Sequence, residues 1–114
     1  MTKITSTGVY CTDPLPPGGR RLTKGAPVKK AEGGVMAIGC FVDRDGTEYI
    51  LPVNRSFNAK ITAKLTMGDW ILSAAEISQE TGKPLAAVET ARQPIDVTLD
   101  PGEGRLFVLK SKGR

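Results

Sequence analysis

The stretch from Ile95 to Leu109, IDVTLDPGEGRLFVL, indicates the fold class of the chain. Its first five residues alternate apolar and polar side chains, which is the pattern of a strand with one buried and one wet face. Pro101 fixes φ at the start of a tight turn, and Gly102 supplies a residue that adopts a positive φ without strain. A second apolar run begins at Leu106. The stretch therefore predicts a β-hairpin.

A second hairpin is predicted in the middle of the chain. The apolar run Val35–Val42 and the β-forming run Thr47–Val53 flank Asp43-Arg44-Asp45-Gly46, which has the composition of a turn. Both runs are nearly continuous in apolar residues. We therefore expect both arms to be central and buried strands.

Strand patterns recur about every ten residues. Lys60–Thr66 alternates and predicts a half-exposed strand, and Leu85–Thr90 predicts a further one. Trp70–Ile77 is also interpreted as a strand, although an amphipathic helix competes for it on propensity. This rhythm of about eight strands with turns between them predicts an antiparallel β-sandwich of jelly-roll or immunoglobulin-like type.

The length of 114 residues fits one domain, which we expect to span residues 1–114. Proline and glycine are dense from Cys11 to Gly34, and this density is incompatible with helix and with long central strands. Only Arg20–Thr23 is expected to form a short strand there. Residues 1–34 are therefore predicted to be an extended edge segment packed on the sandwich.

Several classes of protein are excluded by composition. The chain has no histidine, which removes histidine-based triads and most zinc sites, and it has no apolar run of about 20 residues that could span a bilayer. Cys11 and Cys40 could form a disulfide in an extracellular setting. Alternatively, Cys11 is a surface thiol and Cys40 is a small buried apolar residue. Met1–Tyr10 has no apolar centre of a signal peptide. If the chain is a domain of a longer secreted parent, the signal of that parent lies upstream.

The net charge of +4 raises the question of nucleic acid. Many basic residues lie in the Gly/Pro-rich stretch or at the C-terminal tail, where we expect them mainly to increase solubility. No RNP, KH or zinc-knuckle motif accompanies them. We expect no nucleic-acid partner, and a basic nucleic-acid-binding protein is the third hypothesis.

Four phrases occur in an order that resembles a known family. They are Gly39-Cys40-Phe41-Val42-Asp43, Val53-Asn54-Arg55-Ser56, Ser78-Gln79-Glu80-Thr81-Gly82-Lys83 and Leu99-Asp100-Pro101-Gly102-Glu103-Gly104-Arg105-Leu106-Phe107. Over roughly Val35–Leu109 the chain resembles β-sandwich domains at the C-terminal ends of microbial glycoside hydrolases of the β-glucanase type. The resemblance implies an attachment to an enzyme that acts on plant polysaccharide. Related modules commonly bind the polymer, and some carry structural calcium.

The first hypothesis is therefore a non-catalytic, extracellular carbohydrate-binding module that binds a cell-wall polysaccharide such as β-glucan or cellulose and targets a linked catalytic domain. The alternative is a structural sandwich that packs against that catalytic domain and binds no ligand.

A sugar site needs exposed aromatic planes for the pyranose rings and fixed polar groups for the hydroxyls. Trp70 begins a strand beside a turn and is either a ligand platform or the core anchor of the sandwich. Tyr49 has the strand parity of Leu51 and Val53, so it is expected to point inward or lie at an edge. The full set of candidates is Trp70, Tyr49, Tyr10, Phe57, Asn54, Arg55, Asn58, Asp69 and Glu76.

Metal binding and catalysis have weaker signals. Asp43, Asp45 and Glu48 could contribute oxygen ligands to calcium, but EF-hand spacing is absent and Asp-Gly is by itself a turn signal. Glycoside hydrolysis needs two carboxyl groups about 5 to 10 Å apart on a cleft, and no spacing of acidic residues singles out such a pair. We expect no enzymatic activity, no metal site and no cofactor.

Overall fold

The computed structural model describes residues 4–23, 25–90 and 93–112, and these form nine strands and no helix. The all-β, sandwich-like prediction is confirmed, with nine strands in place of about eight. The strands are β1 (Ile4–Cys11), β2 (Val28–Glu32), β3 (Met36–Asp43), β4 (Glu48–Asn54), β5 (Ile61–Met67), β6 (Ile71–Glu76), β7 (Val88–Glu89), β8 (Ile95–Leu99) and β9 (Phe107–Ser111).

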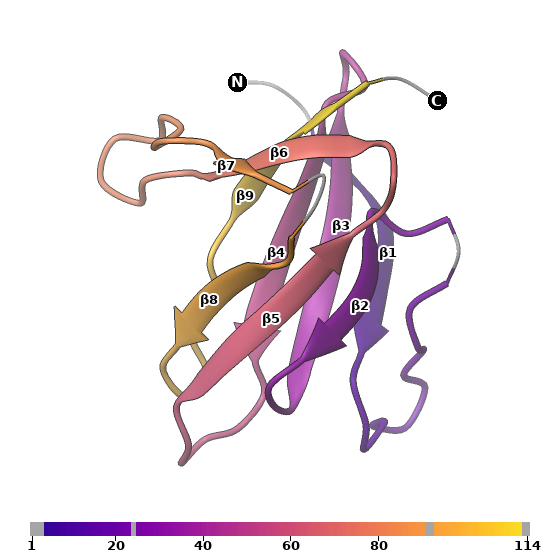
Figure 1. Ribbon diagram of the computed structural model, residues 1–114. Helices are drawn as coiled ribbons and strands as arrows, with labels where there is room; N and C mark the ends of the chain where they lie inside the picture. The colour runs from indigo at the N-terminus through magenta and orange to yellow at the C-terminus, as the bar shows by residue number, and fades with distance from the viewer. Residues whose placement is uncertain (1–3, 24, 91–92, 113–114) are drawn as a thin grey trace.

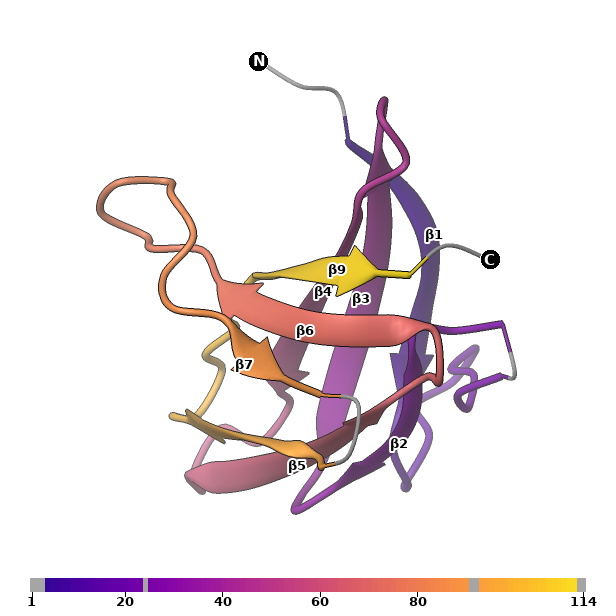
Figure 2. The ribbon, with the colours of Figure 1, turned by 45° about the horizontal axis from the view of Figure 1, so that its top comes forward.

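Two antiparallel sheets stack face to face. The large sheet has six strands in the order β1-β3-β4-β9-β6-β7, and the small sheet has three in the order β2-β5-β8. Figure 1 shows the small sheet in front of the large one, and Figure 2 shows β9, β6 and β7 crossing over β3 and β4. Within the described residues no helix is long and apolar enough to cross a membrane.

The predicted hairpin from Ile95 to Leu109 is wrong. β8 pairs with β5 in the small sheet, whereas β9 lies between β4 and β6 in the large sheet. The turn itself forms as predicted, because Gly102 has φ of 73° and the Glu103 N–H donates to the Asp100 carbonyl oxygen at 2.9 Å. Gly104 then bridges to Val53 of β4. The chain thus uses this turn to change sheets.

The β3–β4 hairpin is confirmed, with the register running from Met36 opposite Asn54 to Val42 opposite Glu48. Its turn is closed by the side chain of Asp43. The Asp43 Oδ1 accepts the backbone N–H groups of two following residues, at 2.9 Å and 3.0 Å. Local side-chain hydrogen bonding of this kind is what favours aspartate in turns.

The predictions for the other segments have mixed outcomes. Trp70–Ile77 is indeed a strand rather than a helix, while Leu85–Thr90 contributes only the two residues of β7. The first 34 residues contain two strands, β1 and β2, each at the edge of a sheet. Arg20–Thr23 is not a strand. Its first carbonyl oxygen instead accepts the Cys11 N–H at 2.7 Å, which ties the loop to β1.

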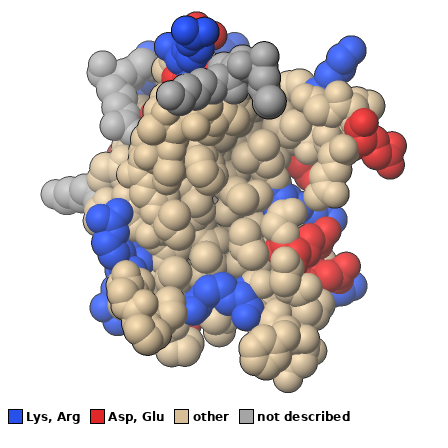
Figure 3. Space-filling model, turned by 180° about the vertical axis from the view of Figure 1, so that it is seen from behind, with Lys and Arg blue, Asp and Glu red and all other residues tan. Residues whose placement is uncertain are grey.

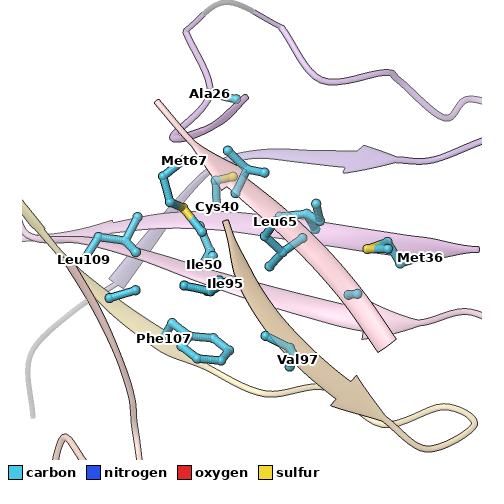
Figure 4. Packing of buried hydrophobic residues seen from close by; sticks show 14 of the residues in the cluster. Ala26, Met36, Cys40, Ile50, Leu65, Met67, Ile95, Val97, Phe107 and Leu109 are labelled. Atoms are coloured by element: carbon cyan, nitrogen blue, oxygen red, sulfur yellow. The ribbon is translucent and has the colours of Figure 1, made fainter. Parts of the chain in front are cut away.

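The core lies between the sheets and takes alternate side chains from both (Figure 4). Met36, Ile38 and Cys40 of β3 meet Leu65 and Leu99 of the small sheet, and each is at most 1% exposed. Burial, with a smaller contribution from the charge of a nearby glutamate, raises the pKa of the Cys40 thiol to about 11.

The two cysteines are free thiols. Cys40 lies opposite Gly8 in the β1–β3 ladder, whereas Cys11 lies opposite Ala37, three residues further along β3. A small buried apolar residue is therefore the role of Cys40.

Replacing Gly33 tests the connection between the two sheets. Gly33 joins β2 to β3 with φ of 110°, and a Cβ there would overlap the Thr62 carbonyl oxygen. Gly33→Ala should lower the free energy of unfolding by about 2 to 4 kcal/mol, because backbone strain and overlap add. Gly82→Ala is the control, since Gly82 has φ of 71° but open space around it and should cost only about 1 kcal/mol. Urea unfolding measures both, and equal losses would contradict this account.

Candidate functional site

The nine predicted ligand residues do not form one site. Trp70 and Asp69 lie after β5, whereas Asn54, Arg55, Phe57 and Asn58 lie before it, so the whole length of β5 separates the two groups. Tyr10, Tyr49 and Glu76 are on three further strands. The structure therefore does not bring these side chains together around a single ligand.

Asn54 is a structural residue rather than a ligand contact. It is 0% exposed, and its Nδ2 donates to the carbonyl oxygens of Ala59 (2.7 Å) and Leu99 (3.1 Å). Its Oδ1 accepts the Ser56 N–H at 2.9 Å. The amide thus links the end of β4, the following loop and the end of β8, and it has no access to solvent.

Arg55 also holds loops together. Its Nη2 donates to the carbonyl oxygens of Thr12 (3.0 Å) and Pro14 (2.7 Å), so the guanidinium fastens the loop after β1 to the end of β4. Asn54 and Arg55 therefore organise the end of the sandwich from two sides. The prediction that they bind a ligand directly is not supported by this geometry.

The two tyrosines occupy different environments from those expected of sugar platforms. Tyr10 is 7% exposed, and the Arg20 guanidinium lies 5.2 Å from its ring centre. Tyr49 shares its face with Leu51 and Val53, as predicted, but this face points outward, because the buried residues of β4 are those between them. The expectation that Tyr49 points inward or lies at a sheet edge is therefore wrong, since β4 lies between β3 and β9.

Tyr49 is also a hydrogen-bond donor. Its hydroxyl donates to Asp43 Oδ2 at 3.2 Å. Burial raises the pKa of Tyr49, and so do this hydrogen bond and the negative charges of Asp43 and Asp45. Asp43 uses both carboxylate oxygens within its own hairpin. Within the described residues, no group of three or more Asp, Glu, Cys or His side chains is placed to hold a metal ion.

Trp70 packs against the core and also borders a hollow at the surface. Its ring packs against the core and lies across Gly68, whose added Cβ would come within 2.7 Å of it. Its remaining surface lines a hollow of about 410 Å³. The rim carries an ion pair between Lys29 and Asp69, with 3.5 Å between Nζ and Oδ1. The hollow is completed by Leu22, Thr23 and Ala26.

Phe57 is the most exposed large apolar residue among those the structure describes. Its side chain is 93% exposed, although its loop is ordered by hydrogen bonds. The Ser56 Oγ accepts the N–H groups of Asn58 (3.3 Å) and Ala59 (3.0 Å), and the Ser56 carbonyl oxygen accepts the Gly102 N–H at 3.1 Å. A tightly hydrogen-bonded loop thus presents one phenyl ring to solvent.

A further apolar surface includes only one of the predicted ligand residues, Tyr49. On the side of the large sheet away from the core, the register of the ladders places apolar side chains next to one another, while Ser6, Asp43, Ser73 and Lys110 share this side toward its ends. Phe41 lies opposite Tyr49, which lies opposite Val108. We call this surface the apolar outer face; its members are Val9, Ala37, Phe41, Tyr49, Leu51, Val53, Ala75 and Val108.

The apolar outer face is free of charge in its middle. Figure 3 views the molecule from behind, and the lysine, arginine, aspartate and glutamate side chains lie mainly toward the margins of this side. Val9 is 53% exposed, Phe41, Leu51 and Val108 are half-buried, and Ala75 is 8% exposed. No described segment of the chain is layered over these residues, since they lie on the outside of a two-sheet sandwich.

The outer face of the small sheet has the opposite character. There β5 and β8 alternate between buried residues and residues that are exposed or, at Thr66, half-buried. The outward residues pair as Thr62 with Thr98 and Lys64 with Asp96. One sandwich thus has a wet outer face and an apolar one, and only the wet face resembles that of a free-standing antiparallel sheet.

The sequences of β3 and β4 contain a pattern that could have indicated the apolar outer face. The runs of β3 and β4 are apolar at inward and outward positions alike, which is typical of strands buried on both faces. The prediction of central, buried arms recognised this pattern. The structure covers only one of their two faces, so the sequence encodes more burial than the described residues provide.

Comparison with known proteins gives no relative. No protein-family model matches the chain, and neither a curated protein sequence nor a solved structure matches it significantly. The relationship to glycoside hydrolase domains therefore stays a prediction from the four sequence phrases.

The structural role of Asn54 has a direct test. Asn54→Ala would leave the buried Leu99 carbonyl oxygen without this donor, and the free energy of unfolding should fall by about 2 to 4 kcal/mol. Asn58→Ala removes the same amide from an exposed position and should change it by about 0.5 kcal/mol or less. Chemical denaturation of both variants gives the comparison. A harmless Asn54→Ala would show that the two sheets do not depend on this amide.

Proposed function

We propose that this chain is a non-catalytic β-sandwich domain that docks through its apolar outer face onto another protein domain. The partner that the sequence resemblance implies is the catalytic domain of a secreted glycoside hydrolase. The supporting observation is the contrast between the two outer faces, one polar and one apolar. A contiguous exposed apolar patch on a small protein is characteristic of a protein interaction site.

The size of the face agrees with an interface between domains. Five strands, from β1 to β6, contribute to it. With strands about 4.8 Å apart and about 3.3 Å per residue, the patch from Ala37 to Phe41 measures roughly 19 Å by 13 Å, about 250 Å² before its rim is counted. Interfaces between domains of one chain bury about 300 to 750 Å² on each side.

The position of the first and last strands is also compatible with this docking. Ile4 at the start of β1 lies opposite Asp43, and Leu109 near the end of β9 lies opposite Glu48. Both strands therefore reach the same end of the sandwich, beside the β3–β4 turn (Figure 1). A domain joined at either point would start at the border of the apolar outer face.

Leu51→Lys tests the proposal by placing a charge in the middle of the face. In the isolated chain it should change the free energy of unfolding by about 1 kcal/mol or less, because the side chain points outward. In the complete protein encoded by the reading frame that contains this chain, it should cost about 2 kcal/mol more, because the lysine would be buried unpaired in the interface. Calorimetry of both forms measures the difference.

Thr98→Lys on the wet face is the matched control and should have the same small effect in both forms. The proposal is overturned if Leu51→Lys also has equal effects in both forms, or if the reading frame encodes no domain besides the sandwich.

Glycan binding is a second candidate function, and Phe57 is the observation that favours it. The hydrogen bonds around Ser56 fix the loop before any ligand arrives, so little further ordering is needed for a pyranose ring to stack on the phenyl plane. Asn58 lies next to the ring in sequence and offers an exposed amide to hydroxyl groups. Phe57 is therefore better placed than the partly buried Trp70 as an aromatic platform.

Electrophoresis in native gels containing soluble β-glucan should therefore retard the wild-type chain. Phe57→Ala should weaken the apparent affinity about tenfold, which corresponds to a loss of about 1.4 kcal/mol of stacking. Leu85→Ala removes another exposed apolar side chain, 54% exposed, and should have no effect. A wild type that no glycan retards removes this second function and leaves the docking proposal untouched.

A further inference from the structure

We propose that the free edge of β8 binds an extended segment of a partner protein by strand addition. The segment would carry apolar side chains at alternate positions and a basic residue that reaches the mouth of the adjoining groove. This site lies at the open side of the sandwich, away from the apolar outer face, and it is independent of the docking proposed above.

The edge supplies the main-chain part of the site. β8 ends the small sheet and, among the described residues, pairs with β5 alone. In an antiparallel ladder about half of the backbone N–H and C=O groups point away from a single neighbour, so β8 presents a row of them on its free side. Figures 1 and 2 show β7 beyond this edge, and β7 pairs with β6 rather than with β8.

A groove beside the edge supplies places for side chains. It has a volume of about 280 Å³ and lies between β8 and the β6–β7 arm. The core residues Ile95, Val97 and Phe107 form its floor, and Figure 4 shows Val97 and Phe107 side by side. Leu85 and Val88, 54% and 47% exposed, stand on the arm beside it.

An added strand meets both features at once. Its main chain would pair with the free side of β8, and every second side chain would point toward the groove, because successive side chains of a strand alternate between faces. Main-chain pairing combined with pockets for alternate side chains is how exposed sheet edges recognise extended peptides. The exposed Leu85 and Val88 would then be covered.

Charge at the groove mouth selects the kind of segment. Arg105 lies 3.6 Å from a carboxylate oxygen of Glu76 and 3.7 Å from one of Glu103. Asp96 also lines the groove, with Lys64 opposite it on β5. Three carboxylates (Glu76, Asp96 and Glu103) and two basic groups (Lys64 and Arg105) therefore meet here, which leaves one carboxylate in excess. The chain as a whole has a net charge of +4.

A basic partner fits this local excess of negative charge. A second copy of the chain, paired edge to edge, would instead bring two acidic groove mouths together, which like charges oppose. The occupant is therefore a different polypeptide segment.

The peptide acetyl-KVTVTVK-amide provides a concrete probe, titrated into the isotope-labelled chain and followed by amide chemical shifts. We expect saturable shifts centred on Ile95–Leu99. The same peptide with alternate backbone nitrogens methylated cannot pair through its main chain and should bind at least about tenfold more weakly. A peptide with glutamate in place of both lysines should also bind more weakly at low salt.

Matched valine substitutions locate the site. Val88→Asp on the arm should weaken binding of the lysine peptide about tenfold or more. Val9→Asp, equally exposed on the apolar outer face, should leave it unchanged, so failure here and failure of the docking proposal are distinguishable. The inference is overturned if no saturable shift occurs up to about 1 mM peptide, if the methylated peptide binds equally well, or if Val9→Asp weakens binding as much as Val88→Asp.

Discussion

The arrangement of this fold depends on the point where the chain leaves the small sheet and enters the large one. At the end of β8, the Leu99 carbonyl oxygen accepts a hydrogen bond from the fully buried amide of Asn54, at the end of β4. The turn at Gly102 then carries the chain to β9, which lies between β4 and β6. Without β9 in that place, β6 and β7 would have no partner linking them to β4. One buried amide therefore secures the crossing on which the six-stranded sheet relies.

The functional proposal follows from this six-stranded sheet. Because β9 joins β4 to β6, the outward side chains of β1, β3, β4, β9 and β6 form one continuous apolar surface. The small sheet covers the inner side of these strands and nothing described covers the outer side. Burying apolar area is the main favourable term in association as in folding, so an uncovered face of this kind favours a partner.

Local patterns predicted the strands and turns but not their partners. Ile95–Leu99 alternates as a one-sided strand should, and Pro101-Gly102 turns the chain, yet nothing local says that the next strand belongs to the other sheet. Tyr49 shows the same limit. Its parity with Leu51 was readable, but because both faces of β4 are apolar, the pattern could not say which side faces the core.

The nine predicted ligand residues are dispersed for a related reason. Asn54 and Arg55 were chosen as polar residues close to Phe57 in sequence. The sequence could not show that both side chains donate hydrogen bonds to backbone carbonyl oxygens of other segments. Phe57 is exposed, and its polar sequence neighbours offered no apolar partners that would explain it as a core residue.

The solvent accessibility of methyl groups tests most directly whether the apolar outer face is an interface. It is measured as the relaxation caused by a soluble paramagnetic probe, in the isolated chain and in the complete protein. The methyl groups of Leu51 and Val108 should relax in the isolated chain and be shielded in the complete protein, while that of Thr98 should relax in both. Equal relaxation of Leu51 and Val108 in the two forms would contradict the claim that the apolar outer face is an interface.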